Sequence, residues 1–169
     1  MSYKIAVASS DQTNIDQTFG DAAQFLVYEV DDKRNYSLAE RRDVPLILEF
    51  IRELANYEKM LHEVVATEEV LIESLFERKI AEVIIGEYEN KPVAFAVFFY
   101  NFSTFVGRPG IYLEDIYVKP KMRGKGIGKI ILSFLAKLAI ERNCGRLEWA
   151  CLDWNEPSIQ FYKHLGAVP

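Results

Sequence analysis

The feature that most constrains this chain is a glycine-rich loop between an apolar strand and an apolar helix. The loop has the sequence Arg-Gly-Lys-Gly-Ile-Gly-Lys over residues 123–129. Residues 111–118 before it have the composition of a strand, and the residues after it place apolar side chains at helical spacing: Ile127, Ile130, Ile131, Phe134, Leu135 and Leu138. Alternate glycines let the backbone turn tightly and expose successive N–H groups at a helix N-terminus. The pattern predicts an anion-binding loop suited to a diphosphate.

The spacing of the glycines excludes two other phosphate loops. A Walker A loop needs GxxxxGK[ST], but Gly124 and Gly128 are four apart and Ile130 stands where Ser or Thr is required. The dinucleotide fingerprint GxGxxG also fails, because the glycines fall as GxGxG. A glycine-rich surface turn with solvated charges is the remaining alternative. The strand before the loop, the helix after it and the cations Arg123, Lys125 and Lys129 favour anion binding.

Length and charge limit the class of protein. The 169 residues fit one domain, or one domain with an appendage, and half of them are hydrophobic, which argues against disorder. A net charge of −5 argues against nucleic acid as the main partner and favours a cationic small molecule. Cys144, Cys151, His62 and His164 lack metal-ligand spacing, so we expect no metal. With no secretory pattern, no apolar run long enough for a membrane helix and two free thiols, we expect a cytoplasmic location.

The order of elements predicts a mixed α/β (α+β) fold. We expect strands at 81–88, 92–102, 111–118 and 145–152, and helices at 43–54, 67–76, 127–138 and 155–165. Asp43 and Pro45 have the properties of an N-cap and a first-turn residue, and Gly166 those of a residue just beyond a C-cap. The prediction is a mainly antiparallel central sheet flanked by helices. The aromatic run 95–102 is expected in the sheet core or on a dimer face.

Four segments resemble one family. LANYEKM (54–60), YLEDIYV (112–118), RGKGIGK (123–129) and DWNEPSIQFYKHLGA (153–167) are similar to the GNAT superfamily of N-acetyltransferases. The similarity is greatest to its diamine (spermidine/spermine) and thialysine acetyltransferases. It runs from about residue 36 to the end of the chain. The resemblance implies the acetyltransferase fold, acetyl-CoA as cosubstrate and a small amine as acceptor.

The resemblance also implies roles for particular residues. The backbone of Ile116, Tyr117 and Val118 would bind the pantetheine arm. The diphosphate would be held by Arg123, Gly124, Lys125, Gly126, Ile127, Gly128 and Lys129. Asn155 and Ser158 would contact the coenzyme from the last helix, and Tyr162 would lie near the thioester sulfur. Tyr57, Glu58 and Glu114 would line the acceptor site.

An amine acceptor needs carboxylates to attract the cation and a base to remove a proton. Glu114 and Asp115 are adjacent on a strand, so their side chains point to opposite faces. We choose Glu114 as the base, with Asp115 structural or lining the other face. Tyr162 is the candidate proton donor to the leaving thiolate. Structural alternatives stay open: a core aromatic for Tyr162, a salt-bridged strand carboxylate for Glu114 and a solvated helix residue for Glu58.

The sequence thus predicts an acetyl-CoA-dependent N-acetyltransferase acting by direct attack of the amine in a ternary complex. Polyamines, diamines and lysine-like amino acids are the expected acceptors. Cys151 has no histidine near it in sequence, so we do not expect an acyl-enzyme. A homodimer is expected, without nucleic-acid or membrane partners. The alternatives are a chimeric chain that binds coenzyme A without turnover and a fragment of a metallocluster carrier.

The two ends depart from the acetyltransferase pattern. Residues 1–34 contain two apolar runs expected to be strands, and about 40 N-terminal residues resemble the opening of the dinitrogenase iron–molybdenum cofactor biosynthesis family. Thr18 stands where that family commonly has His before Phe19-Gly20. The family-typical last strand is absent after Pro169, so we expect the N-terminal strands, or a partner subunit, to cover or extend the sheet. The predicted domains are an appended segment, 1–34, and the acetyltransferase domain, 35–169.

Overall fold

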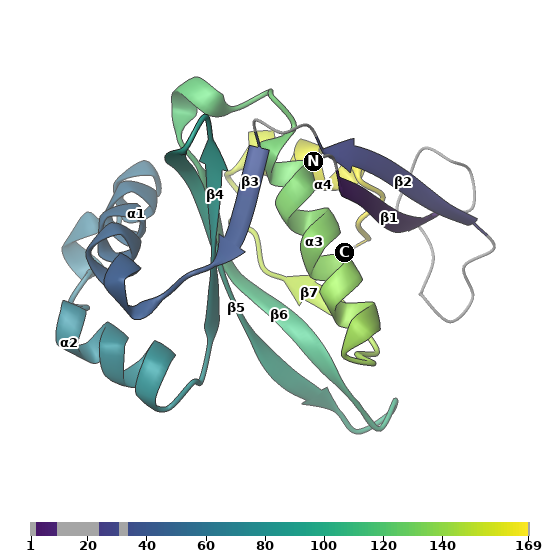
Figure 1. The fold of residues 1–169 in the computed structure, drawn as a ribbon, viewed down its shortest axis with the longest axis horizontal. Helices are drawn as coiled ribbons and strands as arrows, with labels where there is room; N and C mark the ends of the chain where they lie inside the picture. Colours follow the sequence, from purple (N-terminus) through teal and green to yellow (C-terminus); the bar gives the residue numbers. More distant parts are fainter. Residues whose placement is uncertain (1–2, 10–23, 31–33, 169) are drawn as a thin grey trace. The chain divides into compact units, whose positions relative to one another are not determined.

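The computed structural model describes residues 3–9, 24–30 and 34–168, which include a five-stranded mixed sheet (Figure 1). The strands lie in the order β3 (Arg34–Leu38), β4 (Glu82–Tyr88), β5 (Lys91–Ser103), β6 (Arg108–Val118) and β7 (Leu147–Trp149). β4 pairs antiparallel with β3 and with β5, whereas β6 and β7 are parallel. The predicted fold class, a mixed and mainly antiparallel sheet with helices, is confirmed.

The chain divides into two compact units. One, here called the α1 unit, comprises residues 33–99 and 114–128. The other, the α3 unit, comprises residues 1–32, 100–113 and 129–169. β5 and β6 are long strands that contribute residues to both units.

Helices follow β3 in the α1 unit. After η1 (Arg41–Asp43), α1 (Val44–Tyr57) begins as predicted, with Asp43 at its N-cap and a proline in its first turn. The Asp43 carboxylate accepts a hydrogen bond from the Glu40 N–H at 2.7 Å, so it ties the preceding turn instead of capping α1. Beyond η2 (Leu61–Glu63), α2 (Glu68–Leu71) is capped by the Thr67 hydroxyl and continues as the π-helical η3 (Ile72–Glu77). The second predicted helix is therefore confirmed.

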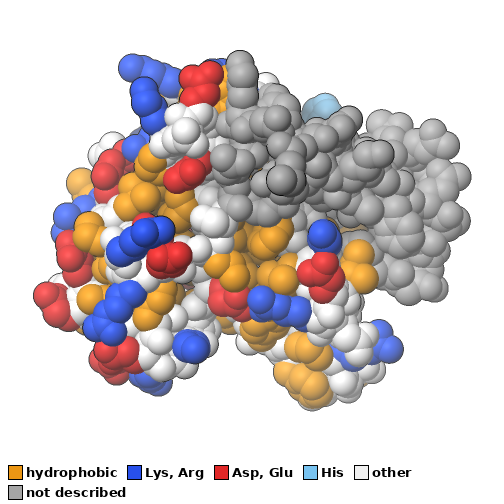
Figure 2. Space-filling model, in the orientation of Figure 1, with side chains coloured by type: hydrophobic (Ala, Val, Ile, Leu, Met, Phe, Trp, Pro, Cys, Tyr) orange, Lys and Arg blue, Asp and Glu red, His pale blue; other side chains and the backbone are white. Residues whose placement is uncertain are grey.

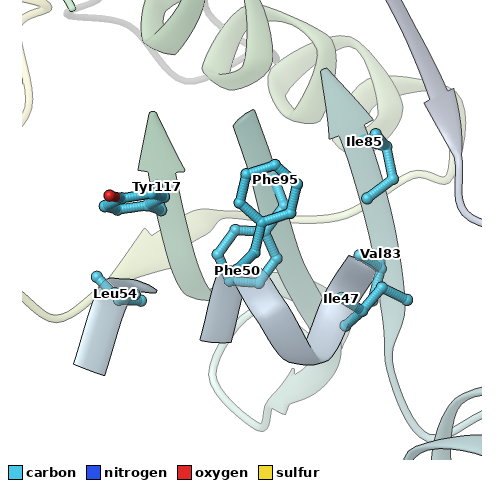
Figure 3. Close-up of a cluster of buried hydrophobic side chains, with 7 residues drawn as sticks. All are labelled: Ile47, Phe50, Leu54, Val83, Ile85, Phe95 and Tyr117. Atoms are coloured by element: carbon cyan, nitrogen blue, oxygen red, sulfur yellow. The ribbon is translucent and has the colours of Figure 1, made fainter. Parts of the chain in front are cut away.

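The core of the α1 unit lies between α1 and one face of the strands. Its buried side chains are Ile47, Phe50, Leu54, Val83, Ile85, Phe95 and Tyr117 (Figure 3). The rings of Phe50 and Phe95 stack with centroids 5.2 Å apart, and the Tyr117 ring meets Phe50 edge-on at 6.4 Å. Aromatic pairs in these geometries contribute about 0.5–1.5 kcal/mol beyond burial of their area. The packing connects α1 to β6, the strand that leads into the glycine-rich loop.

Two helices and the short strand β7 belong to the α3 unit. α3 (Ile127–Glu141) buries Ile131 and Leu135, as its spacing predicted, but Leu132, Ala136 and Ala139 are buried as well. The buried surface of α3 is therefore wider than the single apolar stripe that its spacing predicted. α4 (Glu156–His164) begins after Asn155 and ends before Gly166, which has the left-handed φ of +80° expected beyond a C-cap.

Two strand boundaries differ from the prediction. β7 spans only Leu147–Trp149, not 145–152, because its pairing with β6 is limited to Ile111–Leu113. The predicted strands 92–102 and 111–118 are each longer at this end, since β5 extends to Ser103 and β6 begins at Arg108. β5 and β6 close around a turn at Gly107, whose φ is +66° and whose N–H donates to the Ser103 carbonyl at 2.8 Å.

The N-terminal strands form a sheet of their own. β1 (Tyr3–Ser9) and β2 (Gln24–Val30) pair antiparallel, from Tyr3 opposite Val30 to Ser9 opposite Gln24. The two predicted strands are confirmed, but the expectation that they extend the central sheet is wrong, since they pair with each other in a separate sheet. Thr18, Phe19 and Gly20, compared above with the cofactor-biosynthesis family, lie outside the described residues.

Candidate active site

The glycine-rich loop connects the end of β6 to α3 through the short helix η4 (Pro120–Met122). Residues 123–126 are exposed, and Gly124 and Gly126 have φ values of +75° and +81°. A Cβ at Gly124 would meet no atom within 4 Å, so the glycine is required by its backbone conformation and not by lack of space. Glycines of positive φ at alternate positions let neighbouring N–H groups converge on one anion. The loop has the backbone conformation that diphosphate binding would require, and its binding of a diphosphate stays a prediction.

Two cations of the loop rest on tyrosine rings. The Arg123 guanidinium carbon lies 4.6 Å from the ring centroid of Tyr57 and 5.6 Å from that of Tyr117, while its Nε–H donates to the Val118 carbonyl at 3.0 Å. The Lys125 ammonium lies 5.4 Å from the Tyr88 centroid. These contacts hold long, exposed side chains in place by cation–π attraction. Ile127, Gly128 and Lys129, also predicted to hold the diphosphate, form the first turn of α3.

The C-terminal half of β6 lacks a ladder partner on the β7 side. Among the described residues, β7 pairs with Ile111–Leu113 only. The backbone of Ile116, Tyr117 and Val118, predicted to bind the pantetheine arm, follows that paired segment. Unpaired strand N–H and C=O groups are the groups that an extended ligand can use.

The acidic residues predicted for the acceptor divide between the two faces of β6. Asp115 alternates with Leu113 and Tyr117, which are 1% and 6% exposed, so it shares their face, the one that packs against α1. Glu114 is exposed and points from the other face. Burial, reinforced by the charges of Glu114 and Glu58, raises the pKa of Asp115 from 3.8 to about 6.

Glu58 and Tyr57 lie at the end of α1. Glu58 is the C-cap residue, and partial burial raises the pKa of its carboxyl. Its charge acts on Asp115, so these two carboxylates share one region of the α1 unit. Asp115 and Glu58 thus both lie near the end of α1, and the acceptor-site roles of Tyr57, Glu58, Glu114 and Asp115 stay predictions. The sequence carries no signal for this placement of Asp115, because Glu114 is flanked by the apolar residues Tyr112 and Ile116 just as Asp115 is flanked by Leu113 and Tyr117.

Lys119, just after β6, forms an ion cluster with two carboxylates of α1. The Lys119 ammonium is 3.4 Å from both the Glu49 and the Glu53 carboxylates and 5.1 Å from the Phe50 ring centroid. Desolvation lowers the pKa of Lys119, but the two carboxylates outweigh it and raise the pKa on balance. Figure 2 shows acidic and basic side chains interspersed with hydrophobic ones on the face that carries α1 and α2, without a continuous basic surface in that view.

Tyr162 and its neighbours on α4 belong to the α3 unit. The Tyr162 ring is partly buried against Trp149 of β7, with centroids 5.0 Å apart and an angle of 47° between the rings. Asn155 is 7% exposed and stands at the N-cap of α4, where its carbonyl accepts from the N–H groups of Ser158 and Ile159 at 3.0 Å. Ser158 is partly buried in the first turn. The contacts of Asn155, Ser158 and Tyr162 with a coenzyme stay predictions.

Comparison with known proteins identifies the family. The family model described as "Acetyltransferase (GNAT) family" matches residues 48–167. The chain belongs to the GNAT acetyltransferase family. It is an N-acetyltransferase by this membership, and enzymes of the family use acetyl-CoA. The match spans the α1 core, both faces of β6, the glycine-rich loop and Tyr162.

Named relatives support the same assignment. The thialysine N-epsilon-acetyltransferase of Bos taurus is 40% identical over 138 residues, covering 76% of this chain and 81% of the bovine protein. The L-ornithine N5-acetyltransferase of Arabidopsis thaliana is 29% identical and covers 77% of each chain. Among solved structures, an integron cassette protein of V. cholerae matches with a TM-score of 0.69 and 26% identity over 82% of this chain and 88% of its own.

The N-terminal resemblance is confirmed as well. A family model described as "Dinitrogenase iron-molybdenum cofactor" matches residues 1–72. The match is longer than the roughly 40 residues expected from the sequence, and it overlaps the acetyltransferase match over residues 48–72. Those overlapping residues include most of α1 and the start of η3.

Two further observations concern ligands and membranes. Within residues 37–168, no group of three or more His, Cys, Asp and Glu side chains is arranged to hold a metal ion. In the part of the chain that the structure describes, no helix is long and apolar enough to cross a membrane.

Proposed function

We propose that this enzyme transfers an acetyl group from acetyl-CoA to a primary amine of a small cationic acceptor, by direct attack within a ternary complex. Polyamines, diamines and lysine-like amino acids are the acceptor class. The observation that carries the proposal is that the partly buried carboxylates of Asp115 and Glu58 interact electrostatically. Glu58 directly follows Tyr57, whose ring contacts Arg123 of the glycine-rich loop. The relatives named for thialysine and L-ornithine support this acceptor class.

The donor would be held along β6 and the loop. Arg123, Lys125 and the backbone around Gly124 and Gly126 would bind the diphosphate, and the backbone of 116–118 the pantetheine arm. Asn155 and Ser158 would add contacts from α4. When bound, acetyl-CoA supplies an electrophilic thioester carbonyl.

The acceptor must lose a proton before it attacks. An alkylammonium has a pKa of about 10.4, so forming the free amine at pH 7 costs about 4.6 kcal/mol. The carboxylates of Asp115 and Glu58 would attract the cation, because opposite charges in a partly buried site interact strongly. Asp115, with a pKa of about 6, is ionised at neutral pH and is a stronger base than an ordinary aspartate. Glu114, directly or through water, stays the candidate predicted from the sequence.

The leaving thiolate needs a proton donor. The Tyr162 hydroxyl would donate to the sulfur of coenzyme A, whose thiol has a pKa near 8.5 like that of free cysteine. The packing of Tyr162 against Trp149 restricts its ring and supports such a role.

Three further predictions accompany this proposal. We propose that residues 1–34 are an appended segment on an acetyltransferase domain of residues 35–169, that the enzyme forms a homodimer, and that it acts in the cytoplasm. Light scattering of the full chain beside a version starting at Asn35 tests the first two. A shortened chain of equal stability and solubility would agree with a dispensable appendage.

An amine panel tests the function directly. The release of coenzyme A thiol from acetyl-CoA is measured with thialysine, L-ornithine, L-lysine, spermidine and putrescine, with the neutral alcohol ethanol as control. Calorimetry with acetyl-CoA runs in parallel. Turnover of at least one cationic amine is expected. Binding without turnover for every amine would instead identify a coenzyme-binding module, and iron or molybdenum uptake without coenzyme binding a metallocluster carrier.

The base is identified by comparing Glu114→Gln with Asp115→Asn. If Asp115 accepts the proton, its variant loses the rise of kcat/KM near pH 6 and E114Q keeps it. The opposite result assigns the base to Glu114.

A further inference from the structure

Arg123 is held by three contacts that leave its terminal nitrogens available. Its Nε–H donates to the Val118 carbonyl at 3.0 Å, and its guanidinium carbon lies over the Tyr57 and Tyr117 rings, 4.6 and 5.6 Å from their centroids. Among the described residues, no carboxylate lies within ion-pair distance of Arg123, although the chain is acidic overall. A guanidinium carries five N–H donors in a planar fork. With the side chain held through Nε and the two rings, the Nη atoms can bind an anion without reorganising it.

The two rings that contact Arg123 differ in what fixes them. Tyr117 is 6% exposed and packs on Phe50 in the core of the α1 unit, so it is a rigid support. Tyr57 is the last residue of α1 and is only partly buried. It precedes Glu58, whose charge reaches Asp115. Tyr57 also packs against the core of the α1 unit. Arg123 therefore connects the glycine-rich loop to an aromatic side chain of the acceptor region.

We propose that Arg123 is a positioning residue that couples the two substrates. When its Nη atoms hold the coenzyme diphosphate, its face keeps the Tyr57 ring in the orientation that the amine needs, so that coenzyme binding raises amine affinity. This inference rests on the proposed function and adds a coupling that acts through Tyr57. By linkage, amine binding raises coenzyme affinity by the same factor.

The test measures amine affinity with and without coenzyme A, which prevents turnover. The amine is the panel member with the highest kcat/KM, and the ratio of its two Kd values is the coupling factor. Coupling factors between sites are commonly about 5- to 150-fold, so we expect at least about 5-fold in the wild-type enzyme. Arg123→Lys keeps the charge but not the planar guanidinium, and should bring the factor close to 1.

Changes at Tyr57 separate positioning from general stability. Tyr57→Leu should also bring the factor close to 1, while coenzyme affinity without amine stays within about 2-fold of wild type. Tyr57→Phe keeps the ring and should keep the coupling. In the double variant R123K/Y57L the factor should be no lower than in either single variant, because one contact carries it.

Lys125→Ala is the matched comparison. Lys125 is also a loop cation on a tyrosine ring, but its ring, Tyr88, lies on β4 and not on α1. Its loss should weaken coenzyme binding and leave the coupling factor unchanged. At saturating acetyl-CoA, R123K should raise the amine KM, whereas K125A should not.

The possible outcomes separate failure of the coupling role from failure of the proposed function. An unchanged coupling factor in R123K or Y57L, with normal turnover of the wild-type enzyme, overturns the coupling role and leaves the acetyltransferase proposal intact. A factor near 1 in the wild-type enzyme does the same. Failure of the wild-type enzyme to bind coenzyme A, or to acetylate any panel amine, overturns the proposed function and this inference with it.

Discussion

Replacing Asp115 by asparagine should make the protein more stable at neutral pH and less active. A carboxyl whose pKa rises from 3.8 to about 6 on folding, chiefly through burial, binds its proton more tightly in the folded state. Above pH 6 the ionised form therefore makes the fold less stable, by about 3 kcal/mol at most. Between pH 6 and 3.8 the folded protein takes up a proton that the unfolded chain does not bind, and this destabilisation disappears.

The assay is urea unfolding of wild type and Asp115→Asn at pH 7.5 and at the lowest pH where both fold reversibly. Because an amide does not ionise, D115N should be about 1–3 kcal/mol more stable than wild type at pH 7.5. The advantage should shrink steadily below pH 6. Glu114→Gln, at an exposed position that only adds to the electrostatic field on Asp115, should give a much smaller gain.

The same substitution has a kinetic signature. A cationic acceptor stabilises the ionised form of Asp115, so wild-type kcat/KM for the amine should rise with pH through about 6. D115N should lose that rise and have a lower kcat/KM throughout. If D115N is no more stable than wild type at pH 7.5, or if its advantage is the same at pH 4, the carboxylate is not held in a desolvated, negatively charged environment and the reasoning is wrong.

Three other substitutions test the proton donor, the core and the β5–β6 hairpin. Tyr162→Phe should lower kcat by about 100-fold while calorimetry shows unchanged acetyl-CoA affinity; equal kcat values would exclude Tyr162 as proton donor. Phe50→Ala should destabilise the α1 unit by about 3–5 kcal/mol in urea unfolding, since the Phe50 ring is fully buried, and a change under 1 kcal/mol would contradict the core described here. Gly110→Ala should lower the free energy of unfolding by about 1–3 kcal/mol, because its Cβ would lie 2.6 Å from Asn101 Oδ1; Gly107→Asn, at an open turn of positive φ, is the tolerated comparison.

The parts of the fold that the sequence predicts are those set by local chemistry. Asp43 and Pro45 mark the start of α1, Thr67 that of α2, and Gly166 the end of α4, since caps and turn residues act on backbone groups a few positions away. The boundaries of β7 are not predictable in this way. They depend on the register with β6, a pairing between residues more than thirty positions apart.

The candidate site shows the same division between local and long-range information. Glycines 124 and 126 are recognised from their spacing because each carries its requirement in its own φ. The contact of Arg123 with Tyr57 joins the loop to a helix end far away in sequence, so no local pattern reports it. Alternation places Asp115 on the same face as Leu113 and Tyr117, but only the packing shows that this face is the buried one at Asp115. The raised pKa of Asp115 has the same origin, since burial is its main cause and the charges of Glu114 and Glu58 add to it.

The arrangement of β6 explains how one strand can serve two substrates. Its side chains alternate, so Asp115 lies on the face packed against α1 while Glu114 points from the opposite face. Its backbone lies in the plane of the sheet and, among the described residues, is unpaired by β7 beyond Leu113, and these are the groups proposed to bind the extended donor. At its end the Val118 carbonyl accepts from Arg123, the first residue of the anion loop. The side chains of β6 thus point out of the sheet while its backbone groups point within the plane of the sheet. Both can serve their proposed roles only if the register of the strand is fixed. The aromatic contact of Tyr117 with Phe50 supplies that constraint from the core, so a slip of one residue, which would exchange Asp115 for Glu114 on the α1 face, would also expose Tyr117.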